Sequence, residues 1–265
     1  MTDKQEKMST KAKLSKLHCP FTWEILDSFI KHSTVYHESS NNENNPMDDE
    51  TFDPLEQLLI CLFKCYKAVS SIDKDEATKS VEKAGEILIQ IQQEKEFCQM
   101  IRAIEHVFYA TKCFFLYDAD DMDGVEEILQ NIIDPEEFSN IELGALYGCQ
   151  SVIWSILNNF GMNEAVDTAK KAVEKNQECA LWHFILAKNL RRQRRLQNIL
   201  SNPSDMEKKH FEIAYAMSKN DMFGVYYLQM RLECFFEYSK ERNYIMKKNA
   251  NERDVVHTAK QILNT

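Results

Sequence analysis

Residues 140–175, NIELGALYGCQSVIWSILNNFGMNEAVDTAKKAVEK, contain the pattern that decides the fold of this chain. An apolar helical stretch runs to residue 159, the turn Asn159-Phe160-Gly161-Met162 interrupts it, and a second helical stretch follows over 163–175. In the second stretch Ala165, Ala169 and Ala172 are spaced four and three apart, so they share one helix face. Small side chains on one face let two antiparallel helices pack closely. The segment therefore predicts a helix pair.

The same spacing recurs along the chain. Ala77, Val81 and Ala84 repeat it most closely. Looser copies are Val125, Leu129 and Ile132; Glu207, Phe211 and Ala214; and Val255, Ala259 and Ile262. Each helix pair leaves an apolar face that only a neighbouring pair can cover. The repeats therefore predict an all-α protein in which antiparallel helix pairs stack as a solenoid.

Composition supports a helical protein and limits its functions. The 265 residues include only 6 Gly and 5 Pro, fewer than sandwiches, barrels or nucleotide-binding α/β folds need for their turns. A net charge of −10 disfavours nucleic-acid binding by the whole surface and leaves only a local patch or groove. The sequence has no Gly-rich phosphate loop, GxSxG elbow or HExxH motif. We therefore expect a non-enzymatic protein with no catalytic residues, cofactor or metal site.

The cysteines and the hydropathy pattern bear on localisation. The 8 cysteines lie singly in apolar helical contexts, without CxxC pairs or zinc-type clusters, and are predicted to be buried free thiols. Free thiols fit a reducing compartment. No segment has the character of a signal peptide or of a membrane span. The expected location is the cytoplasm, with no membrane contact.

Composition divides the chain into four parts. Residues 1–16 are polar and Lys-rich and are predicted to form a flexible arm. Residues 17–37 are predicted to form an N-terminal docking helix, with Pro20 in a first turn that tolerates proline. Residues 38–52 read as a polar loop. Residues 53–265 are predicted to form the helical repeat domain.

Residues 179–195, CALWHFILAKNLRRQRR, hold the densest basic cluster of an otherwise acidic chain. No acidic residue occurs from Cys179 to Ser204. On a helix, Trp182, Leu186 and Leu190 would form a stripe that faces the core. A second stripe carries the side chains of Phe184, Lys188, Arg191 and Arg195. This local inversion of charge is the main functional signal in the sequence.

Two resemblances to known families follow from these residues. The small-residue offsets resemble those of the tetratricopeptide repeat, a helix-turn-helix unit of about 34 residues. With Ala165 and Ala172 at two of its small positions, Ala187 falls at a third in the next unit. The resemblance implies a right-handed solenoid with a concave groove.

The second resemblance lies near the N-terminus. The run LHCPFTWEIL, residues 17–26, resembles the opening of the interferon-induced proteins with tetratricopeptide repeats. Members of that family are RNA-binding antiviral effectors of innate immunity without catalytic activity. This resemblance implies binding of RNA or of protein partners.

The repeat phase places residues from successive units on the predicted groove. Its anion-binding residues would be Lys188, Arg191, Arg192 and Arg195, and its stacking or groove residues would be Tyr147, Gln150, Trp154, Phe184 and Tyr226. Aromatic rings stack on bases while guanidinium groups pair with phosphates, so single-stranded RNA is the first expected ligand. The alternative is a protein-interaction adaptor that recognises an acidic peptide segment or a partner helix.

Other interpretations of the basic cluster remain open. RRQRR can be a solvated helix end, where cations complement the helix dipole, with the aromatic residues in the core between repeats. It can also be a nuclear-import signal. The sequence does not indicate an oligomeric state.

Two further features have structural interpretations. Residues 118–124, DADDMDG, lack two of the oxygen ligands of an EF-hand loop, and are instead predicted to cap a helix that starts near Asp121. His106 and His183 lie among apolar residues and are predicted to be hydrogen-bonded core histidines.

Overall fold

The computed structural model describes residues 10–26, 53–199 and 201–241, with side chains up to residue 234. These residues form helices and turns and contain no strand, so the all-α prediction is confirmed for the described part of the chain. The chain divides into two compact units, 1–175 and 176–265. A single repeat domain over 53–265 stays a prediction. The predicted loop 38–52 and the last repeat copy, at Val255, lie outside the described residues.

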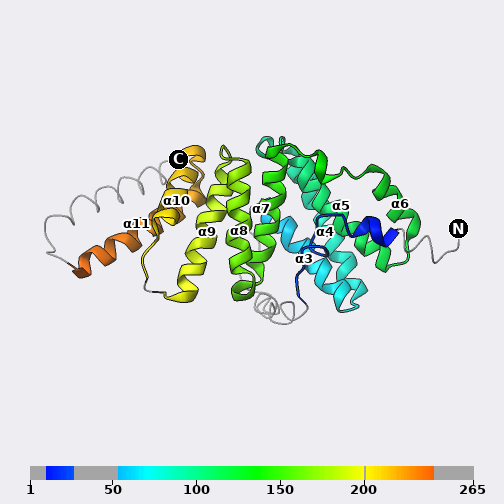
Figure 1. Ribbon diagram of the computed structural model, residues 1–265, viewed down its shortest axis with the longest axis horizontal. Coiled ribbons are helices and arrows are strands. Elements are labelled where there is room, and N and C mark those ends of the chain that lie inside the picture. Colours follow the sequence, from blue (N-terminus) through cyan, green and yellow to red (C-terminus); the bar gives the residue numbers. More distant parts are fainter. Residues whose placement is uncertain (1–9, 27–52, 200, 242–265) are drawn as a thin grey trace. The chain divides into compact units, whose positions relative to one another are not determined.

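The first unit is built from pairs of consecutive helices. From residue 53 onward its α-helices are α3 (Pro54–Ser70), α4 (Lys74–Gln93), α5 (Ile101–Asp118), α6 (Met122–Asn131), α7 (Asn140–Ile156) and α8 (Met162–Lys175). Its short 3-10 helices are η3 (Lys95–Phe97), η4 (Pro135–Glu137) and η5 (Asn158–Phe160). Helix α3 packs on α4, α5 on α6, and α7 on α8 (Figure 1). Helix α3 also contacts both α5 and α7. The α3–α7 contact joins helix pairs that are not adjacent in sequence, and a right-handed solenoid stays a prediction.

Polar side chains fix where several of these helices begin. The carboxylate of Asp53 accepts from the backbone N–H of Leu55, and that of Asp121 accepts from the N–H of Gly124. Ser139 and Glu142 form a reciprocal capping box at the start of α7. Such caps satisfy backbone donors that have no partner within the helix. The predicted capping role of Asp121 is confirmed.

The α7–α8 pair confirms the helix pair predicted from residues 140–175. Ala165, Ala169 and Ala172 are each 0% exposed. The Ser151 hydroxyl donates to the Ala165 carbonyl at 2.7 Å, which joins the two helices by a buried hydrogen bond. In the turn, a Cβ on Gly161 would lie 2.2 Å from the Trp154 carbonyl oxygen, so a larger residue would force the backbone to move. Small residues thus set both the spacing and the turn of the pair.

Replacing Ala172 by leucine is expected to destabilise the protein by about 1 to 3 kcal/mol, because the added carbons must displace packed neighbours. Urea denaturation monitored by circular dichroism measures the change. The matched control is Glu174→Leu, which adds the same side chain on an exposed position of α8 and should change stability by about 0.5 kcal/mol or less. Equal midpoints for the two variants would contradict the close packing of Ala172.

The N-terminal segment differs from its prediction. Residues 20–24 form turns instead of the expected docking helix, and residues 27–37 lie outside the described part. The Thr22 hydroxyl bonds to both the N–H and the carbonyl of Cys19, and Glu24 has a φ of 57°, which a right-handed helix cannot accommodate. In the predicted flexible arm, residues 10–14 are helical and Leu14 is buried.

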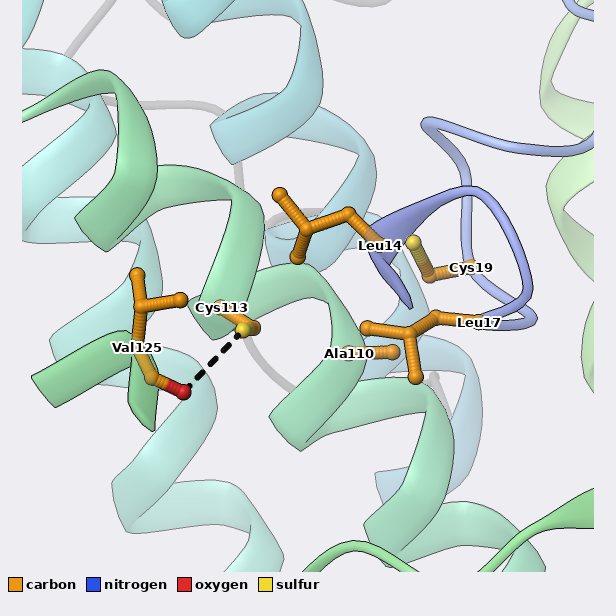
Figure 2. Packing of buried hydrophobic residues seen from close by; sticks show 6 residues of the cluster. All are labelled: Leu14, Leu17, Cys19, Ala110, Cys113 and Val125. Atoms are coloured by element: carbon orange, nitrogen blue, oxygen red, sulfur yellow. Dashed lines mark hydrogen bonds between the residues drawn. The ribbon is translucent and has the colours of Figure 1, made fainter. Parts of the chain in front are cut away.

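Apolar side chains nevertheless dock this segment on the first unit. Leu14, Leu17 and Cys19 join Ala110 and Cys113 of α5 and Val125 of α6 in one buried cluster (Figure 2). The Phe21 ring stacks on Phe114 at 4.7 Å between centroids, and the Tyr66 hydroxyl donates to the Ile25 carbonyl at 3.1 Å. The segment therefore docks through apolar side chains and through backbone hydrogen bonds, although its residues 20–24 do not form the predicted helix.

His106 links this segment to the rest of the unit. The backbone N–H of His18 donates to Nε2 of His106, and Nδ1 of His106 donates to the Ile133 carbonyl. These bonds require a neutral ring with its proton on Nδ1. Burial lowers the pKa of His106 to about 4, although the hydrogen bond to Ile133 and the charge of Asp134 oppose this change. The prediction of a hydrogen-bonded core histidine is confirmed.

Acidification is therefore expected to weaken the fold through His106. The ring of the unfolded chain takes up a proton below about pH 6.5, and the ring of the folded protein only near pH 4. The contribution of the neutral His106 ring to the free energy of unfolding is therefore complete above pH 6.5 and is lost as the pH falls from 6.5 to about 4. The loss amounts to at most about 3 kcal/mol. Denaturant unfolding at pH 7.5 and 4.5 should show a smaller pH effect for His106→Gln than for the wild type. Parallel pH dependences would contradict this role.

The second unit contains α9 (Ala180–Gln197), α10 (Asp205–Ser218) and α11 (Asp221–Glu241). Helix α10 packs against both α9 and α11. Trp182 and Leu186 are buried, as their stripe predicts, and Leu190 is half-buried. Phe211 and Ala214 of α10 are also buried. This core fixes the face of α9 on which the arginines lie.

Candidate functional site

Three arginines of α9 converge on one carboxylate of α11. Arg191 Nη2 lies 2.5 Å from Oε1 of Glu233, and Arg195 Nη2 lies 2.8 Å from the same oxygen. Arg194 Nη2 lies 2.5 Å from Oε2. The spacing of three and four residues places the guanidinium groups on adjacent positions of the helix surface. The Glu233 side chain is 24% exposed, so solvent reaches this cluster.

A second carboxylate lies under the cluster. Glu207 of α10 is 0% exposed and receives two parallel hydrogen bonds from Arg194, at 2.9 Å from Nε and 3.0 Å from Nη2. Arg194 also donates to the Ser201 carbonyl. A fork-to-fork arrangement of this kind is the strongest geometry for an ion pair. It joins α9 to α10 and holds the Arg194 side chain in place.

The charges of this cluster lower the pKa of Glu233. Burial alone would raise it, but hydrogen bonds from Arg194 and Arg191 and the charges of Arg191 and Arg195 reverse that effect. Burial likewise tends to lower the pKa of Arg194, and its bonds to Glu207 and Glu233 raise it instead. Three arginines and two glutamates leave a formal charge of +1.

The predicted stacking residue Phe184 lies in the core of the second unit. It is 2% exposed, its ring stacks on Phe223 at 4.4 Å, and Tyr226 meets it edge-on at 5.1 Å. The guanidinium of Arg191 lies over the Tyr226 ring, 5.6 Å from its centroid. The Phe184 and Tyr226 rings are thus already in contact with other side chains of the protein. A base could stack on Phe184 only after a rearrangement of these side chains.

The other predicted site residues are distributed over both units. Lys188 and Arg192 are half-buried on α9, and Tyr226 is half-buried on α11. Tyr147, Gln150 and Trp154 lie on α7 in the first unit, where Trp154 is buried and Tyr147 lies 5.7 Å below the ammonium of Lys171. A groove shared by the two units stays a prediction.

The two carboxylates that complete the site, Glu207 and Glu233, are not among the residues predicted from the sequence. Glu207 occurs at an offset where the other repeat copies have small or apolar residues. An acid at a core position requires a cationic partner, and the arginines of 179–195 are the nearest candidates along the chain. The acid at this repeat offset could therefore have been recognised in the sequence. Glu233 gave no such signal, since it occupies an ordinary position of a long helix.

Other reactive groups in the described residues have structural roles. His183 Nε2 donates to the Gln177 carbonyl, and its Nδ1 lies 2.7 Å from Nδ1 of His210, which confirms it as a hydrogen-bonded core histidine. The cysteines are free, as predicted; most are buried and Cys98 is exposed. Burial raises the pKa of Cys19, Cys65 and Cys149 to about 12, which makes these thiols unreactive.

Two further features are absent from the described residues. Among them, no group of His, Cys, Asp and Glu is placed to hold a metal ion. None of the described helices has the length and apolar character needed to cross a membrane.

Comparison with known proteins leaves the family open. No protein-family model matches the chain, and no curated protein matches it.

Proposed function

We propose that this chain is a non-enzymatic binding module of helix pairs whose second unit binds an extended anionic ligand, with single-stranded RNA as the first candidate. The supporting observation is the convergence of Arg191, Arg194 and Arg195 on the carboxylate of Glu233. Several guanidinium groups that meet at one point suit an oxyanion, because their planar forks match phosphate and carboxylate geometry. In the free protein Glu233 would occupy the position that a ligand phosphate takes in the complex.

The exposure of the cluster fits an exchange of this kind. Arg195 is 46% exposed, and Glu233 belongs to a partly solvated rim. A ligand that replaces Glu233 regains the hydrogen bonds that this carboxylate gives up, so the net cost of displacement is small. Phe184 is unavailable for stacking in this conformation, so phosphate contacts would supply most of the affinity. Strong salt dependence follows, with a slope of roughly −0.7 per neutralised phosphate.

A second candidate ligand is an acidic peptide, which would make the chain a protein-interaction adaptor. The observation in its favour is that the position already holds a carboxylate, with one glutamate side chain contacting three arginines. A glutamate or aspartate of a partner would make the same bonds. The tetratricopeptide-like pairing of the helices suits either ligand.

The test is Glu233→Gln, which removes the competing charge and keeps the shape of the side chain. Binding of fluorescent oligouridylate and of a glutamate-rich peptide is measured by anisotropy at low salt. The preferred ligand should bind about 3- to 10-fold more tightly to this variant, and Arg195→Ala should weaken its binding. Glu212→Gln, an equal charge change at an exposed position of α10, is the control and should have little effect.

The results of these binding measurements distinguish single-stranded RNA from an acidic peptide as the ligand. Tighter binding of RNA supports the first, and tighter binding of the peptide alone supports the adaptor. If the wild type binds neither ligand, or if Glu233→Gln tightens neither, the cluster is a structural ion-pair network and the proposal fails.

A further inference from the structure

The first unit has a hollow between α5 and α6 that the proposed function does not use. Its volume is about 490 Å³. Helix α5 contributes Tyr109, Lys112 and Leu116, which share one helix face by their spacing of three and four. Helix α6 and its cap contribute Asp121, Gly124, Glu127, Ile128, Asn131 and Ile132. Two helix faces thus form the walls of a surface groove.

The lining of this groove combines polar and apolar side chains, and its apolar part is partly open to solvent. Tyr109 is 39% exposed, and Leu116, Ile128 and Ile132 are half-buried. Gly124 lets α6 approach α5 closely, since a Cβ there would lie 3.0 Å from Cδ1 of Leu116. Amphipathic helices commonly bind in grooves of this kind by laying their apolar face on the floor.

Acidic residues are concentrated around the turn between α5 and α6, although Lys11, Lys13 and Lys16 belong to the N-terminal segment that packs against the same two helices. The end of α5 and the first turns of α6 carry Asp118, Asp120, Asp121, Asp123, Glu126 and Glu127. The sequence has no Lys or Arg between Lys112 and Lys170. Lys112 is the one basic residue among those that line the groove. An acidic rim favours a basic partner by steering its approach, and disfavours nucleic acid and acidic peptides.

We propose that the α5–α6 groove is a docking site for a basic amphipathic helix of a partner protein. Apolar side chains of that helix would contact Tyr109, Leu116 and Ile128, and its lysines or arginines would pair with Glu127 and the neighbouring acids. This site lies wholly within the first unit and shares no residue with the arginine cluster on α9.

The test uses a synthetic helical peptide with leucines on one face and lysines on the other, and a counterpart with glutamates in place of the lysines. The lysine peptide should bind the wild-type protein and the glutamate peptide should not. Double replacement Glu126→Lys and Glu127→Lys should weaken binding of the lysine peptide by about tenfold or more. Tyr109→Ala should also weaken it, by removing exposed apolar contact area.

The matched control is Glu82→Lys with Glu86→Lys on α4, which makes the same change of net charge at exposed residues outside the groove. Circular dichroism verifies that each variant is folded, and Glu127→Gln serves as a milder variant if the double replacement unfolds. If the groove and control variants weaken binding of the lysine peptide equally, the interaction depends only on the net charge of the protein and the proposal is wrong. Equal binding of the two peptides, or no binding, would also overturn it. Arg195→Ala should leave this interaction unchanged, which separates it from the α9 site.

Discussion

Replacing Glu207 by alanine is expected to lower the free energy of unfolding by about 3 to 5 kcal/mol. The carboxylate is fully buried and receives two hydrogen bonds from Arg194, whose side chain is itself only 10% exposed. Removing the acid leaves a buried guanidinium that has lost one of its two carboxylate partners, and also leaves a cavity between α9 and α10. Denaturant unfolding measures the loss.

The control for this variant is Glu212→Ala on the same helix. Glu212 is exposed, so its replacement should change stability by about 0.5 kcal/mol or less. Combining Glu207→Met with Arg194→Met should recover much of the loss, since well-packed apolar residues can replace a buried ion pair. If Glu207→Ala is as stable as the wild type, the Glu207–Arg194 pair makes no net contribution to the free energy of unfolding.

Replacing Phe184 by alanine is expected to destabilise the second unit by about 3 to 5 kcal/mol. Its ring is buried between Phe223, Tyr226 and Phe211, with centroid distances of 4.4, 5.1 and 6.2 Å. Loss of the ring removes these contacts and leaves a cavity that α9 and α11 cannot fill without moving. The expected readout is a lower unfolding midpoint in urea.

Two further variants test whether that loss of stability comes from the missing apolar volume in the core. Phe184→Leu keeps most of the apolar volume and should cost less than Phe184→Ala. Leu196→Ala truncates an exposed side chain of the same helix and should have little effect. If Phe184→Ala retains full stability but loses RNA binding, Phe184 is a stacking residue, as its position in the repeat phase predicts, and not a core residue.

The packing of α9 also decides which arginine is suitable for a binding test. Helix spacing alone predicts that Arg191 and Arg195, which lie off the Trp182 stripe, can be replaced without effect on the fold. Arg191 is buried and bonded to both Gln229 and Glu233, so its replacement should also destabilise the unit. Arg195 is more exposed and is the better choice for a binding test.

The sequence by itself determined the features that depend on local spacing. The small residues of α8 predict the α7–α8 pair because a helix repeats every 3.6 residues, and side chains three and four apart must share a face. Asp121 predicts a helix start because its carboxylate reaches the N–H of a residue three positions ahead. Such features involve few residues that are close in the chain, so composition and periodicity suffice to find them.

Only the tertiary structure decided which faces meet and which charges pair. Glu233 follows Arg195 by 38 residues, and its bond to that arginine depends on how α9, α10 and α11 pack. The same packing buries Phe184 under Phe223, although its spacing alone would equally suit a groove. At the N-terminus, the backbone of residues 20–24 forms turns where apolar content favoured a helix, because Thr22 and Cys19 bond locally and apolar side chains dock on α3 and α5. Periodicity shows which residues share a helix face, whereas the partner of that face is set by contacts between residues far apart in the chain.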